Sequence, residues 1–407
     1  MRIIKEYGPL HILSPQALSV LQFRALSEPL LPNLKVLHLL HVRGESIPFI
    51  PLLLSPRTTT IHLRFSELDL HRAVVASMIN TLPMLCPNLH AIHLTGLPRD
   101  PMITAAVSEL ALATNQNTLR HFCVDSSLTE EACEVIRKHP DLRTFHTVID
   151  RPNALPTMVL PNLTNINIAY NLSHDWLQGF RGASLGKLTS VTIASESDLI
   201  VDFLGAFESA ALTTSIPGTL SSLVFHTERP WRPIYRSLLP FTQLKILAIW
   251  CSCEPSCSST VDDDIITDLA RAMPKLEVLG LGNYPCKTAA GVTVKGLTAL
   301  AHYCPHLLDL TIHFQVASLD PPAILCFASP GETPIPQQGC ALKYLHVGDI
   351  SVPEESTLMV ALTLVNIFPH LECVNYSDVG WEKVANAIQG SKHLVHSSSE
   401  NVLFVVS

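Results

Sequence analysis

Two short motifs contain residue types that could act as nucleophiles or bind a metal. Residues 182–186 read GASLG and match GxSxG, the pattern of the hydrolase nucleophile elbow. That geometry needs a strand before the serine and a helix after it. Here a helix-like segment, residues 176–180, precedes Ser184, and a strand anchored at Leu188 follows. Because this order is reversed, we interpret the motif as a helix-to-strand turn and expect no enzyme.

The second motif is a cluster of thiols. Cys251, Cys253 and Cys257 follow the spacing C-x-C-x3-C, but a closed zinc site needs four ligands and Cys286 is the nearest further thiol. We therefore favour thiols on a surface turn, with zinc as the alternative. No glycine-rich phosphate loop or dinucleotide fingerprint is found, so we expect neither a metal nor a cofactor.

A repeated pattern organises the chain. An anchor residue is followed by apolar residues at +3 and +5, as in Leu34-Leu37-Leu39. Thirteen anchors recur at a mean spacing of about 28 residues. The anchors are Leu34, Thr58, Leu89, Leu119, Leu142, Leu163, Leu188, Leu220, Leu244, Leu276, Leu307, Leu342 and Leu371. Proline stands two residues before seven of them, where it ends a helix and favours an extended chain.

The segments between anchors contain helical patterns. Ile265, Ile266, Leu269 and Met273 share one face, and Thr260 is the predicted cap of that helix, with Asp262, Asp263 and Asp264 near its positive end. A second apolar face spans residues 294–304. Residues 127–130, Ser-Leu-Thr-Glu, fit a capping box that begins at Ser127.

This period and strand signature predict an α/β leucine-rich-repeat solenoid, horseshoe-like, with about 13 parallel strands on the concave face. Helices or loops would form the convex face. The alternative is a doubly wound α/β sheet, which seldom holds so many strands. We expect one solenoid over residues 1–390, with a long excursion at 315–341, and a C-terminal cap or tail at 391–407.

Histidines concentrate on the predicted strands. The positions +2, +4 and +6 should point out of the concave face, because strand side chains alternate. They hold one Lys or Arg, Arg64, and eight histidines: His38, His62, His93, His121, His146, His226, His313 and His346. At +4, His38, His62, His93 and His146 follow one another with Cys123 between the last two. Neighbouring parallel strands lie about 4.8 Å apart, so a column of imidazoles is expected.

Three interpretations of this column stay open: a half-buried polar face, a partner-contact surface, or a metal-binding column. Trp250 and Tyr344 add aromatic area on later strands, and such residues often anchor protein interfaces. The candidate partner-binding residues are therefore His38, His62, His93, His121, His146, Trp250 and Tyr344. Since charging one imidazole opposes charging the next, we predict lowered pKa values for some of His38, His62 and His93. The rival account is a carboxylate or carbonyl partner for each ring, which would raise its pKa.

Composition limits the classes of function. Of 407 residues, 47% are hydrophobic and 15% charged, which excludes a largely disordered chain. A net charge of -8 argues against a nucleic-acid partner. No signal peptide and no apolar run long enough to span a membrane is found, and the 11 cysteines are scattered. We expect an intracellular protein, cytoplasmic or nuclear, with free thiols and no membrane partner.

Residues 296–307, GLTALAHYCPHL, resemble the repeats of F-box/leucine-rich-repeat proteins, and residues 13–18, LSPQAL, followed by 31–34, LPNL, look like the large fungal set of that family. The resemblance implies that the repeats recognise a target protein and that an N-terminal F-box docks to a Skp-type adaptor and a cullin ubiquitin ligase. No F-box precedes the repeats in this sequence, so we expect this chain by itself not to bind the adaptor. A free-standing scaffold or decoy without a ligase link is the alternative.

Overall fold

The computed structural model describes residues 3–6, 29–66, 71–114, 118–148, 162–169, 187–195, 219–227, 235–251, 261–281, 291–316, 339–347, 351–376 and 379–397. The chain forms two compact units. Unit 1 comprises Met1–Ser195 and Gly205–Thr219, and unit 2 comprises Glu196–Leu204 and Leu220–Ser407. The single solenoid expected over residues 1–390 stays a prediction. The expected excursion at 315–341 lies largely outside the described residues, as does the motif at 182–186.

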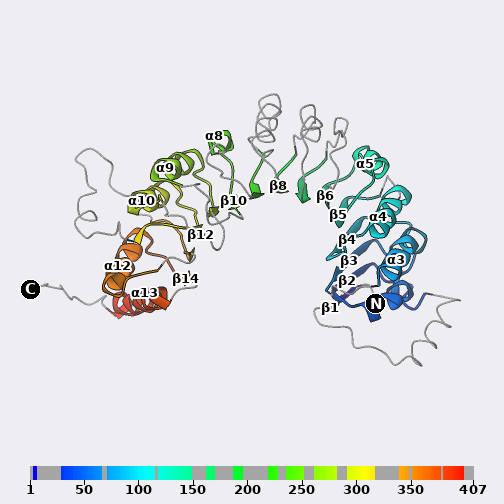
Figure 1. Ribbon diagram of the computed structural model, residues 1–407, viewed down its shortest axis with the longest axis horizontal. Helices are drawn as coiled ribbons and strands as arrows, with labels where there is room; N and C mark the ends of the chain where they lie inside the picture. The colour runs from blue at the N-terminus through cyan, green and yellow to red at the C-terminus, as the bar shows by residue number, and fades with distance from the viewer. Residues whose placement is uncertain are drawn as a thin grey trace, which may run out of the picture. The chain divides into compact units, whose positions relative to one another are not determined.

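Unit 1 contains an open, parallel sheet whose strands pair in chain order (Figure 1). Its strands are β1 (Ile3–Glu6), β2 (Val36–Val42), β3 (Thr60–Phe65), β4 (Ala91–Thr95), β5 (His121–Ser127), β6 (Thr144–Val148), β7 (Asn165–Ala169) and β8 (Ser190–Ser195). The strands β2 to β8 each begin two residues after a predicted anchor, which confirms the strand pattern. β1 was not predicted, because its register places Glu6 opposite Leu39, where the pattern requires an apolar residue.

The helices of unit 1 lie on one face of its sheet (Figure 1). They are η1 (Gly44–Phe49), α2 (Ile50–Leu53), α3 (Arg72–Leu85), α4 (Pro101–Ala113) and α5 (Glu130–Arg137). The prediction of a capping box at Ser127 is wrong. Ser127 ends β5, where its Oγ lies 3.1 Å from Thr104 Oγ1, and Thr129 caps α5 by accepting from the Ala132 N–H. The cap and the start of the helix therefore lie two residues later than the capping pattern suggested.

Unit 2 repeats this arrangement with β9 (Ser222–Thr227), β10 (Ile246–Cys251), β11 (Val278–Leu281), β12 (Asp309–Ile312), β13 (Tyr344–His346) and β14 (Cys373–Asn375), all parallel and paired in chain order. Its helices are α8 (Tyr235–Leu238), α9 (Asp263–Ala272), α10 (Val294–Tyr303), η4 (Glu354–Ser356), α12 (Thr357–Ile367) and α13 (Val379–Ser397). Because α13 runs to Ser397, the predicted boundary between residues 390 and 391 falls inside a helix.

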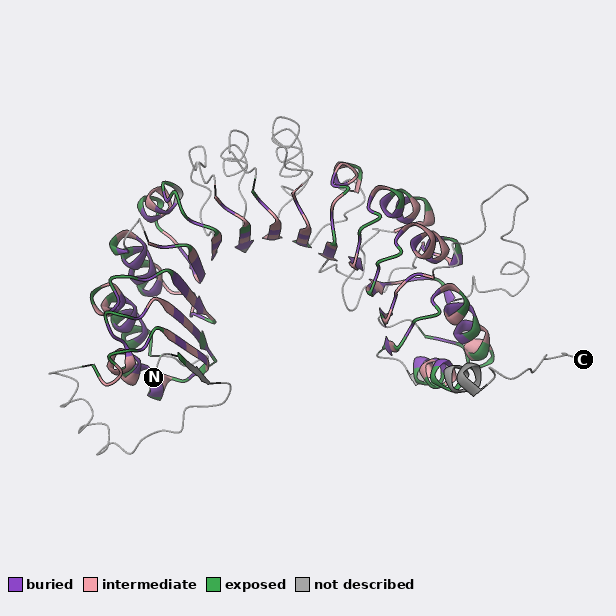
Figure 2. Ribbon diagram, turned by 180° about the vertical axis from the view of Figure 1, so that it is seen from behind, coloured by how far each residue is buried: buried purple, intermediate pink, exposed green. Residues whose placement is uncertain are grey.

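The apolar positions of the repeat form the core between sheet and helices (Figure 2). In unit 1 the +3 residues stand in register on neighbouring strands, and each is 2% exposed or less: Leu37, Ile61, Ile92, Phe122, Phe145, Ile166 and Val191. The predicted helix faces are confirmed as well, since Ile265, Ile266, Leu269 and Met273 of the α9 region are buried. The opposite face of each sheet carries the +2 and +4 residues, which are mostly polar in unit 1.

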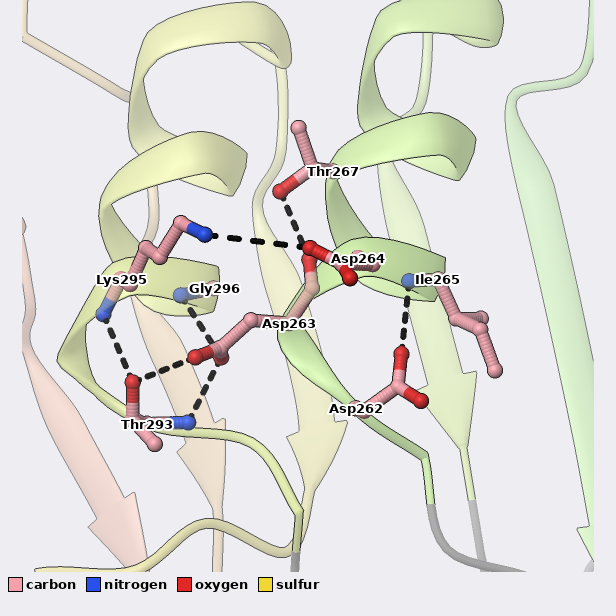
Figure 3. A network of polar contacts seen from close by, with 8 residues as sticks. All are labelled: Asp262, Asp263, Asp264, Ile265, Thr267, Thr293, Lys295 and Gly296. Carbon is pink, nitrogen blue, oxygen red and sulfur yellow. Dashed lines mark hydrogen bonds and ion pairs between the residues drawn. The ribbon is translucent and has the colours of Figure 1, made fainter.

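The start of α9 shows how one repeat fastens the next (Figure 3). Asp262, not the predicted Thr260, caps α9 by accepting from the Ile265 N–H at 2.9 Å, while Thr260 lies outside the described residues. The Asp263 carboxylate instead reaches the first turn of α10. It accepts from the Thr293 N–H at 2.7 Å, the Gly296 N–H at 2.9 Å and the Thr293 hydroxyl at 2.6 Å. Asp262 thus caps its own helix, whereas the neighbouring Asp263 binds the start of the next helix.

We predict that Asp263→Ala lowers the free energy of unfolding by about 2 kcal/mol, because two backbone N–H groups of α10 lose their acceptor. Gly296→Ala should also destabilise, since a Cβ there would lie 2.6 Å from Asp263 Oδ1. Urea unfolding measures both. The matched control is Asp264→Ala, whose side chain is 90% exposed; an equal loss in that variant would contradict the role given to Asp263.

A buried histidine interrupts the apolar core. Three residues before the anchor, other repeats place Cys86, Phe241, Met273, Cys304 and Phe368, all buried. The same position before Leu142 holds His139, which is 1% exposed. Within the described part of the chain, neither of its ring nitrogens has a hydrogen-bond partner. Burial lowers the pKa of His139, and this effect outweighs the nearby Asp141, which raises it.

We predict that His139→Met stabilises unit 1 by about 1–3 kcal/mol at pH 7.5, because an unsatisfied buried polar ring is replaced by an apolar side chain. The gain should grow below pH 6.5, where the unfolded chain binds a proton that the folded ring resists. Thermal unfolding at pH 7.5 and 5.5 checks both statements. A variant less stable than wild type at both pH values would show that the imidazole contributes favourable contacts.

Candidate functional site

The predicted histidine column exists in unit 1. The register aligns His38 with His62, His62 with His93, His93 with Cys123, and Cys123 with His146 across β2 to β6. We call His38, His62, His93 and His146 the histidine row. Because +3 and +5 side chains enter the core, the +4 side chains of this row lie on the face of the sheet that the helices leave uncovered, the open face.

The rings of His38, His62 and His93 are within contact distance from one strand to the next. The ring centroids of His38 and His62 are 4.2 Å apart with an interplanar angle of 12°, so these two rings stack. The centroids of His62 and His93 are 5.0 Å apart, with the rings tilted by 44°. The ring of His121, at a +2 position, is inclined by 25° to that of His93, and the two centroids are 6.4 Å apart. Its Nδ1 lies 2.9 Å from Thr144 Oγ1.

Burial lowers the pKa values of His62, His93 and His121, and neighbouring imidazoles add to this effect at His62 and His93. The pKa of His93 is lowered to about 4, first by burial and then by His62, His121, His146 and His38. The pKa of His62 is lowered by burial and by His38. Burial also lowers the pKa of His121, with smaller effects from Arg143 and Arg120. The predicted direction therefore holds at His62 and His93.

His146, at the β6 end of the row, has the kind of carboxylate partner that would raise the pKa of a histidine. His146 Nε2 lies 3.2 Å from Asp125 Oδ1, yet burial lowers the pKa of His146 more than Asp125 raises it. Asp125 Oδ2 also accepts from the Gly96 N–H at 2.9 Å. Gly96 has a φ of 72°, and a Cβ there would lie 2.2 Å from the Phe65 carbonyl oxygen. Sequence reasoning missed Asp125, although it stands at a +6 position.

Trp250 and Tyr344 belong to unit 2, whereas the histidine row belongs to unit 1. Tyr344 on β13 is 44% exposed. Trp250 at the end of β10 is half-buried, and its ring leans over Gly280, where a Cβ would lie 3.2 Å from two ring carbons. His346 Nε2 lies 3.5 Å from Asp309 Oδ1 on the same face. An aromatic surface on unit 2 thus includes one well-exposed ring, Tyr344.

The metal alternative can be examined for the histidine row, whereas most of the predicted thiol cluster lies outside the described residues. Across the residues that the structure describes, no group of three or more His, Cys, Asp or Glu is arranged to hold a metal ion. Burial and the nearby Asp125 raise the pKa of Cys123 to about 12, so the thiol within the histidine row keeps its proton. Cys251 ends β10, whereas Cys253 and Cys257 lie outside the described residues.

Comparison with protein-family models and with curated proteins finds no match for the chain. In the described ranges, no helix combines the length and the apolar character needed to cross a bilayer.

The lowered pKa of His93 makes unit 1 sensitive to mild acid. An unfolded His titrates near pH 6.5, so between pH 6.5 and about 4 the unfolded chain binds a proton that the folded chain does not. Stability is complete above pH 6.5 and falls as the pH decreases through this window. We predict that wild type loses about 1 kcal/mol more than His93→Gln between pH 7.5 and 5.5. Urea unfolding measures this difference, and NMR titration of a midpoint at or above 6.5 for both His62 and His93 would refute it.

Proposed function

We propose that this chain is a protein-recognition module of the leucine-rich-repeat type, and that its target docks on the open face of the sheet. The open parallel sheet, the chain-order pairing and the repeat of about 28 residues support the leucine-rich-repeat assignment. Repeat proteins of this kind use the extended surface formed by successive repeats for binding.

The observation that carries the proposal is the histidine row with its neighbours. The +2 and +4 positions of unit 1 from β2 to β8 hold His, Thr, Asn, Ser, Cys and small apolar residues, and no Lys, Arg, Asp or Glu. Such a surface can be desolvated at low cost, because few full charges must leave water. Neutral imidazoles offer one donor and one acceptor each, which suits recognition of polar side chains and backbone.

The link to a cullin ubiquitin ligase rests on the family resemblance of residues 296–307. In that proposal the repeats select the protein to be modified, and an F-box supplies the contact with the Skp-type adaptor. Purification of the protein expressed from its native locus tests this link. Recovery of the adaptor and cullin together with the target supports the ligase role, and recovery of the target without them supports a free-standing scaffold.

We predict that open-face substitutions weaken target binding at least tenfold, while helix-face substitutions do not. The variants form two matched pairs: His93→Ala against Met84→Ala of α3 in unit 1, and Tyr344→Ala against Leu358→Ala of α12 in unit 2. Met84 is 76% exposed and Leu358 is 61% exposed, so both controls should preserve the fold. Affinity is measured on the purified target. Loss of binding in the two helix variants with retention in the other two would place the interface on the helices.

A further inference from the structure

The open face of unit 1 has an uneven distribution of charge. Arg64 stands at the +6 position of β3, and Arg120 and Arg143 precede β5 and β6, close enough to affect His121. On the described strands of unit 1, the acidic residue at the +2, +4 and +6 positions is Asp125. Its two oxygens already face His146 and the Gly96 N–H.

The row therefore contains imidazoles that are neutral in the free protein but can still take up a proton. His62 and His93 have lowered pKa values because their rings are partly desolvated and lie next to other imidazoles, with ring centroids 4.2 Å apart for His38 and His62 and 5.0 Å apart for His62 and His93. A carboxylate brought within about 4–6 Å would favour the charged form. An uncharged partner would do the reverse, because it would remove water without supplying an opposite charge.

We propose that the segment docking on the open face of unit 1 is an acidic polypeptide, whose carboxylates lie over His62 and His93 and charge them on binding. This inference rests on the proposed function and adds the chemistry of the partner. Association then takes up protons, so the complex strengthens as the pH falls, although unit 1 itself loses stability in the same range. As the pH falls, the affinity for the partner should rise while the free energy of unfolding of unit 1 should decrease.

A nucleic acid is the other polyanion to consider, and the observations favour a polypeptide. At the +2, +4 and +6 positions of β2 to β8, the permanent positive charge on this face is that of Arg64 alone. Phosphate backbones are bound mainly by clustered Lys and Arg that displace counterions. Carboxylates on a flexible peptide can instead be placed singly over imidazoles.

The test uses the full 407-residue chain and a twelve-residue peptide of alternating Glu and Ser, with the same peptide carrying Gln for Glu as its control. Calorimetry at pH 7.5 and 6.0, in two buffers of different ionisation enthalpy, gives the affinity and the number of protons taken up. We expect the Glu peptide to bind about fivefold more tightly at pH 6.0, with net proton uptake. NMR should show the ring signals of His62 and His93 shifting to higher titration midpoints in the complex.

Two variants assign the effect. His62→Gln with His93→Gln should abolish the pH dependence, and His71→Gln, an exposed histidine on the helix side of the same unit, should leave it intact. Equal binding of the Gln peptide, affinity independent of pH, or tighter binding of a uridine oligonucleotide of the same length would overturn the inference. The proposed function fails separately: a purified target that is insensitive to His93→Ala and Tyr344→Ala contradicts open-face recognition whatever the peptide does.

Discussion

The register of the parallel strands is the constraint on which the rest of each unit depends. At the start of successive strands, the backbone N–H of one repeat donates to the equivalent carbonyl of the repeat before it. In unit 1 this series runs from Lys35 to Thr189, with N···O distances of 2.7–2.9 Å at Thr59, His90, Arg120, Arg143, Thr164 and Thr189. Because the donor and acceptor occupy the same repeat position each time, every side chain stacks on its counterpart.

The same stacking forms the core, the repeat junctions and the open face. Apolar +3 residues form one continuous buried line, and at the start of α10 the Asp263 carboxylate ties two helices together. Each side chain therefore lies directly beside the side chains at the same position of the adjacent repeats, and this contact can stabilise or destabilise the fold. His139 stands in a line of buried apolar side chains, whereas His62 stands between two other imidazoles.

Much of this arrangement could be predicted from the sequence, because strand side chains alternate and the anchor fixes which residues point inward. The positions of β2 to β14 and the alignment of His38, His62 and His93 follow from that rule alone. Contacts that cross between repeats could not be predicted. The reach of Asp263 to Thr293, and of Asp125 to Gly96, depends on loop geometry that no local pattern encodes.

The two helix caps illustrate the same limit. Ser127 and Thr260 both satisfied a capping pattern, but the strand or loop preceding the helix ended elsewhere, and Thr129 and Asp262 became the caps. Trp250 was predicted to present its ring to a partner, and its lean over Gly280 depends on which small residue occupies the next strand. The repeat spacing predicts on which face of the sheet a side chain lies, whereas the exposure of that side chain depends on the size of its neighbours.

The central claim is that equivalent positions of successive repeats stack in register on the open face of unit 1. NMR with selectively labelled histidine tests it most directly, through cross-relaxation between ring protons. The centroid distances of 4.2 and 5.0 Å predict ring-to-ring signals between His38 and His62 and between His62 and His93, and none between His38 and His93. Ring signals that join His38 directly to His93, or none linking His62 to either, would contradict the register.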